Sequence, residues 1–226
     1  MTHAVILLGG WLLACSGGPS EPPAATAEQL LPEIAKSVGD GSLVLASSNV
    51  DDDALAGILA DERVPALRSV TLTDNRVGAE GAGALVGSGK VSGLGWLNLA
   101  QNELGDAGFE VLAGAGALSS LEKLFLADNG ATAVGVKALA ASPHLAGVSY
   151  LSIGDQVVGD DGAKALLSMT ALKRLELPNA GIGGEGARAL IGGTSASALS
   201  LEGNAIGPGG LVGLEGFAPG LTYLSL

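Results

Sequence analysis

Residues 94–112 read LGWLNLAQNELGDAGFEVL, and this stretch carries the pattern that decides the fold. It opens with a leucine frame, Leu94-Leu97-Leu99, in which Leu97 and Leu99 alternate as residues on one face of a strand do. An asparagine follows, and a glycine-paired segment then closes on Leu112. In equivalent segments elsewhere, apolar residues recur three positions apart, which is the spacing of a helix face. The stretch therefore predicts one strand followed by one helix.

The same pattern recurs along the chain at a nearly fixed period. Successive units begin at residues 67, 94, 121, 148, 172, 196 and 221, so the steps are 27, 27, 27, 24, 24 and 25 residues. A less regular first unit begins near residue 40, with Leu43 and Leu45 at its two inward positions. Self-similarity at such a period indicates a solenoid. Because one unit cannot bury its apolar face alone, the stacked units should share one continuous core.

This pattern resembles that of leucine-rich repeats, specifically the ribonuclease-inhibitor-like class, which has a strand and a full helix in each unit. The resemblance covers roughly four fifths of the chain. It implies an α/β solenoid shaped as a curved horseshoe, with a parallel sheet on the concave side and helices on the convex side. The repeat domain is predicted to span residues 28–226. It should begin with a capping helix that has Pro32 near its start and buries Leu30, Leu31, Ile34 and Val38.

The ninth position of most units carries an amide side chain, which can bond the backbone of neighbouring turns. We predict a structural ladder at the strand ends, built from Asn75, Asn102, Asn129 and Asn204. Gln156 can partly replace asparagine in this ladder, whereas Ala180 cannot. A glycine six positions later, such as Gly108, should let each helix start lie close to its neighbour.

The first residues predict export and lipid attachment. An apolar run from Ala4 to Ala14 is shorter than the roughly 20 residues that span a bilayer, but it suits the core of a signal peptide. It ends in Leu12-Leu13-Ala14-Cys15, which resembles the lipobox of bacterial lipoproteins. The resemblance implies cleavage before Cys15, the only cysteine, and lipid on its sulfur. An uncleaved anchor that contains Cys15 is the alternative.

The expected organisation is therefore a signal peptide over residues 1–14, a Pro- and Gly-rich tether over residues 15–27, and the repeat domain. Ser16, directly after the lipidated cysteine, resembles the pattern that goes with sorting to the outer membrane. The sequence thus predicts a lipid-anchored protein of the bacterial cell envelope, at the outer membrane.

The charge balance argues against a nucleic-acid partner and against a basic membrane-binding surface. The formal net charge is -12, with 23 acidic against 11 basic residues, and only Lys173 and Arg174 are adjacent bases. A nucleic-acid binder needs a basic patch that follows phosphates, so no nucleic-acid partner is expected. The same scarcity disfavours a polybasic membrane surface, which leaves the lipid at Cys15 as the predicted membrane contact.

Residues suited to catalysis are scarce. His3 and His144 are the only histidines, and His3 belongs to the signal segment. A Ser-His-Asp arrangement would have to use His144, which we interpret as a surface residue in a loop between repeats. We therefore predict no enzyme activity, no cofactor and no small-molecule substrate.

Two other patterns suggest sites but have simpler explanations. The glycine-rich runs 183–186 and 207–210 lack the Lys-Ser/Thr ending of a phosphate loop and recur at the repeat period, so packing explains them better. The acidic runs 51–53 and 160–161 lack the spaced ligands of a calcium loop. We interpret them as solvated acids at helix starts, where negative charge is favourable, and predict no metal site.

The outward-facing residues of the strands supply the candidate binding site. By alternation, the third and fifth residues of each unit should point out of the core. Four of the six aromatic residues outside the signal segment fall on these rows, at Trp96, Phe125, Tyr150 and Tyr223. We predict that a partner is bound by the central group Trp96, Asn98, Lys123, Phe125, Tyr150, Arg174 and Glu176. The alternative is that the aromatic residues only support one another across the sheet.

Three hypotheses for function follow. The first is a lipid-anchored envelope protein that binds another protein through its concave face. The second is a regulatory module that resembles Ran GTPase-activating proteins, which share this repeat class and act in the cytoplasm. The third is a carbohydrate-binding surface that stacks sugars on Trp96 and Tyr150.

Overall fold

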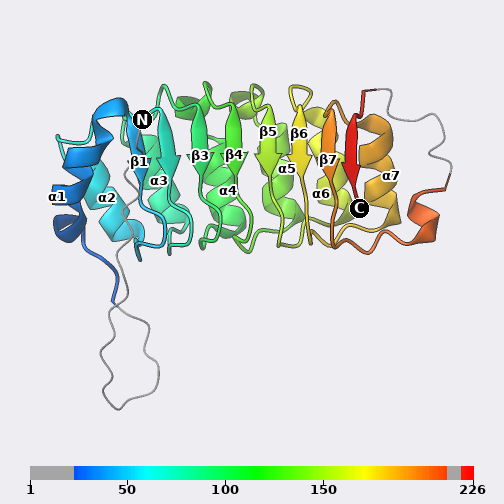
Figure 1. Cartoon of the computed structure of the whole chain (residues 1–226), viewed down its shortest axis with the longest axis horizontal. Helices are drawn as coiled ribbons and strands as arrows, with labels where there is room; N and C mark the ends of the chain where they lie inside the picture. Colours follow the sequence, from blue (N-terminus) through cyan, green and yellow to red (C-terminus); the bar gives the residue numbers. More distant parts are fainter. Residues whose placement is uncertain (1–22, 213–219) are drawn as a thin grey trace, which may run out of the picture.

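The computed structural model describes residues 23–212 and 220–226, and it contains an eight-stranded parallel sheet with helices packed behind it (Figure 1). The strands follow one another in chain order from β1 to β8. The α/β repeat solenoid predicted from the sequence is confirmed. The predicted signal peptide over residues 1–14, Cys15 and most of the tether lie outside the described residues.

Each unit contributes one short strand, and most units contribute one helix. The strands are β1 Ser42–Val44, β2 Ser69–Thr71, β3 Trp96–Asn98, β4 Lys123–Phe125, β5 Tyr150–Ser152, β6 Arg174–Glu176, β7 Ala198–Ser200 and β8 Tyr223–Ser225. The helices are α1 Ala27–Ser37, α2 Asp52–Ala60, α3 Ala79–Gly87, α4 Gly105–Ala113, α5 Ala133–Ala141, α6 Gly159–Ala165 and α7 Gly184–Gly193. Short 3-10 helices occur at η1 Val38–Asp40, η2 Gly116–Leu118, η3 Pro143–Leu145, η4 Leu166–Ser168 and η5 Pro208–Gly210.

All neighbouring strands pair at equivalent repeat positions. Leu97 pairs with Val70 on one side and with Leu124 on the other. The register is unchanged where the unit length falls to 24 residues. The shorter units have fewer residues between the start of the helix and the next strand, so the strands themselves are unaffected. The unit that starts at residue 148 has a helix α6 of only 7 residues, followed at once by η4.

The leucine frame forms one continuous core between the sheet and the helices. Leu97 and Leu99 of β3 and its following turn have no exposed surface, and Phe109 of α4 is equally buried against them. Leu43 and Leu45 are buried too, so the irregular first unit is a true repeat. No helix of the described residues lies on the other side of the sheet, which we call the open face (Figure 1).

Helix α1 covers the first unit, as predicted, but its start was predicted wrongly. Leu30, Leu31, Ile34 and Val38 are buried in the core. However, Pro32 lies inside the helix rather than near its start. The reason is a capping box in which Thr26 and Gln29 bond each other's backbone amides, and this box begins the helix upstream of the proline. Among the described residues, no helix is long and apolar enough to cross a bilayer.

Asn102 shows how the amide side chains join neighbouring turns. Its Oδ1 accepts a hydrogen bond of 2.9 Å from the backbone N–H of Val77 in the preceding unit. Its Nδ2 donates to the carbonyls of Leu72, Leu99 and Ala100 at 2.8, 3.1 and 3.1 Å. Bonds of the same kind are made by Asn75, Asn129, Gln156 and Asn204.

A second set of repeated hydrogen bonds, on the helical side, joins neighbouring helices in every second unit. A carboxylate in the first turn of α2, α4 or α6 accepts a hydrogen bond from the residue that precedes the next helix. The three bonds each measure 2.7 Å, from Gly78 N to Asp52, from Thr132 N to Asp106, and from Gly183 N to Asp160. The acidic runs therefore act at helix starts, where unpaired N–H groups and the helix dipole favour negative charge.

The glycines of the helix starts make room for these carboxylates. A Cβ atom on Gly81, Gly135 or Gly186 would lie 2.4, 2.8 or 2.6 Å from the carboxylate oxygen of Asp52, Asp106 or Asp160, respectively. Close approach of neighbouring helices was expected at this position. In every second unit, the space that the glycine leaves is occupied by a carboxylate from the preceding helix.

Asp106→Ala is expected to lower the free energy of unfolding by about 1 kcal/mol at pH 7, because three donors in and beside the next helix start lose their acceptor. Partial burial acts to raise the pKa of Asp106, but hydrogen bonds from Thr132 and Gly135 outweigh it, and the pKa lies below the ordinary 3.8. A depressed folded-state pKa adds stability that is complete above the unfolded pKa and is lost as the pH falls through the folded one.

Urea denaturation from pH 7 to pH 2.5 measures this contribution. The difference between wild type and Asp106→Ala should shrink once the pH drops below about 3.8. Glu110→Ala, on the exposed side of the same helix, is the control and should change stability by less than about 0.5 kcal/mol. A difference that stays constant down to pH 2.5 would contradict the assigned role of the carboxylate.

Candidate binding site on the open face

Three aromatic rings form a continuous cluster across β3, β4 and β5. The ring of Phe125 lies 4.8 Å from that of Trp96 and 4.8 Å from that of Tyr150, with interplanar angles of 34° and 54°. Trp96 and Tyr150 occupy the third repeat position and Phe125 the fifth, so Phe125 fills the diagonal space between them. Tilted pairs at this separation are favourable arrangements of aromatic rings. We call Trp96, Phe125 and Tyr150 the aromatic cluster.

Two cations flank the aromatic cluster. Lys123 Nζ lies 4.9 Å from the centre of the Trp96 ring, and the Arg174 guanidinium carbon lies 5.3 Å from that of Tyr150. Both distances allow a cation–π attraction. Arg174 is also held by Glu176, whose Oε1 lies 2.7 Å from Nη2 and 2.8 Å from Nε. Six of the seven predicted site residues, all but Asn98, are therefore joined by direct contacts around Phe125 and Tyr150.

Burial raises the pKa of the Tyr150 hydroxyl, and the nearby Glu176 raises it further by hydrogen bonding and charge, while Arg174 acts in the opposite direction. The hydroxyl therefore stays protonated at neutral pH. Because a neutral phenol both donates and accepts hydrogen bonds, Tyr150 adds a polar group to an otherwise apolar cluster.

The outward-facing residues differ in how accessible their side chains are to a partner. Trp96 has 36% of its surface exposed, and Arg174 is also exposed. Asn98 lies on the same face, but its Oδ1 accepts a 3.0 Å hydrogen bond from Ala100 N and so already serves the following turn. Tyr223 is 53% exposed on β8, three strands from the nearest member of the aromatic cluster.

The open face combines one exposed and two half-buried rings, two cations and one carboxylate, an arrangement that suits noncovalent binding. His144 lies elsewhere, half-buried in η3 between α5 and β5. Within the described part of the chain, no three His, Cys, Asp or Glu side chains gather as a metal site. A cavity of about 480 Å³ opens at the helix starts, away from the aromatic cluster, and is lined by residues that include Thr132, Val157 and Asp160.

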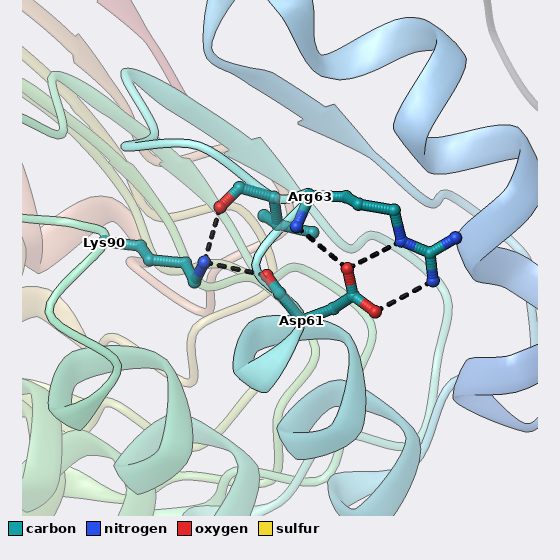
Figure 2. Close-up of polar contacts among 4 residues, drawn as sticks. Asp61, Arg63 and Lys90 are labelled. Atoms are coloured by element: carbon teal, nitrogen blue, oxygen red, sulfur yellow. Dashed lines mark hydrogen bonds and ion pairs between the residues drawn. The ribbon is translucent and has the colours of Figure 1, made fainter.

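Figure 2 shows a polar cluster that was not predicted from the sequence. The Asp61 carboxylate accepts from Arg63 Nε and Nη2, each at 2.8 Å, and Lys90 Nζ donates to the carbonyls of Asp61, at 2.9 Å, and Val64. The hydrogen bonds from Arg63 lower the pKa of Asp61 to about 2. Every acceptor belongs to the loop after α2, and Lys90 reaches it from the loop after α3. The cluster therefore holds two neighbouring loops together and forms no binding site. A D-x-R pattern after a helix is the only sequence signal for it.

Comparisons with known proteins agree with this architecture. The family model described as Leucine Rich repeat matches residues 65–86, which include β2 and most of α3. An internalin from Listeria monocytogenes is similar in structure, with a TM-score of 0.52 and 18% identity over 90% of this chain and 64% of that chain. Internalin C2 from the same bacterium gives a TM-score of 0.53 and 19% identity over 88% of this chain and 91% of that chain. No protein of curated function matches the sequence.

These observations define a repeat solenoid with an aromatic cluster on its open face. The chain has the fold of leucine-rich repeat proteins, and the match within its second unit supports the leucine-rich repeat family. At identities of 18% and 19%, the likeness to the internalins concerns the fold. The chain spans less than two thirds of the length of the first internalin, at 64%.

Proposed function

We propose that this protein is a lipid-anchored protein of the bacterial cell envelope that binds another protein through the open face of its sheet. The observation that carries the proposal is the aromatic cluster Trp96, Phe125 and Tyr150, flanked by Lys123 and Arg174. Aromatic and arginine side chains dominate the energy of protein interfaces. Here they stand on rigid strands and already contact one another, so little conformational entropy is lost when a partner binds.

Mutual support across the sheet is the alternative explanation for these aromatic residues. It accounts for Phe125, which lies between the other two rings, better than for Trp96, which leaves 36% of its surface exposed. An exposed indole beside a lysine and an asparagine offers apolar area and hydrogen-bonding groups at one place. This combination favours a binding role for the cluster.

The anchor is the second part of the proposal. We propose that residues 1–14 are a signal peptide, that Cys15 carries lipid, and that residues 15–27 tether the repeat domain to the outer membrane. The repeats themselves are proposed to be of the ribonuclease-inhibitor-like class. Helices of 9 or 10 residues in five of the units support that class, because they fill the helical half of each repeat.

Trp96→Ala and Phe125→Ala are each expected to weaken capture of the partner about 30-fold or more, since loss of a central aromatic contact costs about 2 kcal/mol. Crosslinking pull-downs from envelope fractions, followed by identification of the captured protein, measure this loss. The thermal transition of Trp96→Ala should stay within a few degrees of wild type because the indole lies on the open face.

Tyr223→Ala is the matched control, since it removes an exposed aromatic residue from the same row outside the aromatic cluster. It should capture the partner as wild type does. If Trp96→Ala unfolds the protein, or if it captures as much as Tyr223→Ala does, the binding role of the cluster is wrong.

Carbohydrate binding and a regulatory module of the cytoplasm are the alternative functions, and each can be told apart from protein binding by experiment. Sugar stacking needs accessible flat faces, and the rings of the cluster are tilted by 34° and 54° against each other, so they form no common platform. Binding on a glycan array would nevertheless favour that function. A module that resembles Ran GTPase-activating proteins requires a cytoplasmic location, and metabolic lipid labelling of Cys15 would argue against it.

A further inference from the structure

Opposite charges line the two sides of the aromatic cluster. At the third repeat position, where the strands begin, stand Lys123 and Arg174, and no described unit has an acid there. At the eighth position, in the turns beyond the strand ends, three exposed acids occur and no described unit has a base; these acids, which we call the acidic edge, are Asp74, Asp128 and Asp155. The position before each strand adds Arg68, Glu122 and Lys173, so the first side stays net positive.

In the described ranges, the unit that contains β4 presents both charges without an ion-pair partner for either. Lys123 has no carboxylate within ion-pair distance among residues 23–212 and 220–226, and it contacts the Trp96 ring instead. In the same described ranges, the exposed Asp128 carboxylate makes no side-chain hydrogen bond. Asp155, by contrast, accepts from Asn179 Nδ2 at 2.8 Å, and Asp74 accepts from the Ser47 hydroxyl at 2.7 Å. Within the described part of the chain, a cation and an anion that both lack an ion-pair partner thus stand on either side of Phe125.

The dimensions of this surface suit a helix better than an extended strand. The third and eighth positions are five residues apart, on the order of 15 Å for chain that is mostly extended. A helix with its side chains is about 10–12 Å wide, so charged residues on its two flanks would reach both sides. Neighbouring strands are about 4.8 Å apart, so the cluster spans roughly 10 Å, or about two helical turns.

We propose that the partner segment recognised by the open face is an amphipathic helix that lies across the strands, with acids on one flank and bases on the other. Its apolar stripe rests on the aromatic cluster, its acidic flank faces Lys123 and Arg174, and its basic flank faces the acidic edge. This proposal rests on the proposed function and specifies its partner. The charge division also sets the direction of the helix, because turning it end for end would place like charges together.

Two synthetic helical peptides of identical composition test the proposal. Both carry leucines at positions i, i+3, i+4 and i+7. In the divided peptide, all glutamates lie on one flank and all lysines on the other, whereas in the mixed peptide each flank carries both. Fluorescence anisotropy with the purified full chain should show the divided peptide binding at least tenfold more tightly than the mixed one. Raising the salt concentration should reduce that preference, since these charges are exposed.

Two variants sharpen the test. Lys123→Glu combined with Asp128→Lys should weaken binding of the divided peptide at least tenfold more than it weakens binding of the mixed peptide, because only the divided peptide depends on the separation of the two charges. Lys137→Glu, on helix α5 behind the sheet, is the control and should leave both affinities unchanged.

The outcomes separate this proposal from the proposed function. Equal affinities for the two peptides, both lost in Trp96→Ala, would overturn the charge division and leave protein binding by the aromatic cluster intact. Failure of both peptides to bind would overturn the helical partner, while the pull-down with Trp96→Ala still reports separately on protein binding.

Discussion

Asn102→Ala is expected to lower the free energy of unfolding by about 3 kcal/mol, as measured by urea denaturation at pH 7. The variant leaves the Val77 N–H without its acceptor in a buried turn and removes three donations to backbone carbonyls. An unsatisfied buried polar group costs about 1–3 kcal/mol, and lost packing adds to that. Because these bonds join two units, the loss should also make unfolding less cooperative across the array.

Two further variants control this experiment. Asn102→Gln should lose less stability than Asn102→Ala, because Gln156 shows that a longer amide can make such bonds: it accepts from Asn129 N and Ala131 N and donates to Leu126 O. Glu103→Ala, one residue along and exposed, should change stability by less than about 0.5 kcal/mol. If Asn102→Ala cost no more than Glu103→Ala, the ladder would be dispensable.

Gly154→Ala is expected to cost about 2–3 kcal/mol, which is typical of an overpacked site. A Cβ atom at this position would lie 2.5 and 2.6 Å from Cγ and Cδ of Pro178 and 2.7 Å from its carbonyl oxygen. That oxygen accepts a hydrogen bond of 2.8 Å from Asp155 N, so it cannot move away freely. The added methyl group would therefore push apart two turns at the strand ends, beside the acidic edge.

The shift of the urea midpoint measures this cost. Pro178→Ala in the Gly154→Ala background should restore part of the stability, because it removes the two ring carbons but leaves the carbonyl in place. Gly95→Ala is the control, since a Cβ there meets nothing closer than 3.9 Å. A loss in Gly154→Ala no larger than in Gly95→Ala would show that the turns adapt.

Much of the candidate site could be predicted from the repeat alone. Once Leu97 and Leu124 are assigned to the core, the alternation of a strand places Trp96, Lys123 and Phe125 on the other face, and a constant register aligns them. Ring-to-ring contact and the position of Lys123 over Trp96 could not be predicted, because they depend on side-chain rotamers. Asn98 illustrates the same limit, since its amide oxygen serves the backbone of its own turn.

The sequence by itself determined the solenoid, its register and the outward rows, because a leucine pattern of fixed period leaves only one stacking that buries every unit. Only the tertiary structure decided how Asp106 of one unit reaches Thr132 of the next. It also decided that, among the described residues, neither Lys123 nor Asp128 has an ion-pair partner, and that Lys123 contacts the Trp96 ring. The physical reason is that such contacts depend on where neighbouring units place their side chains, whereas periodicity fixes only which positions are buried.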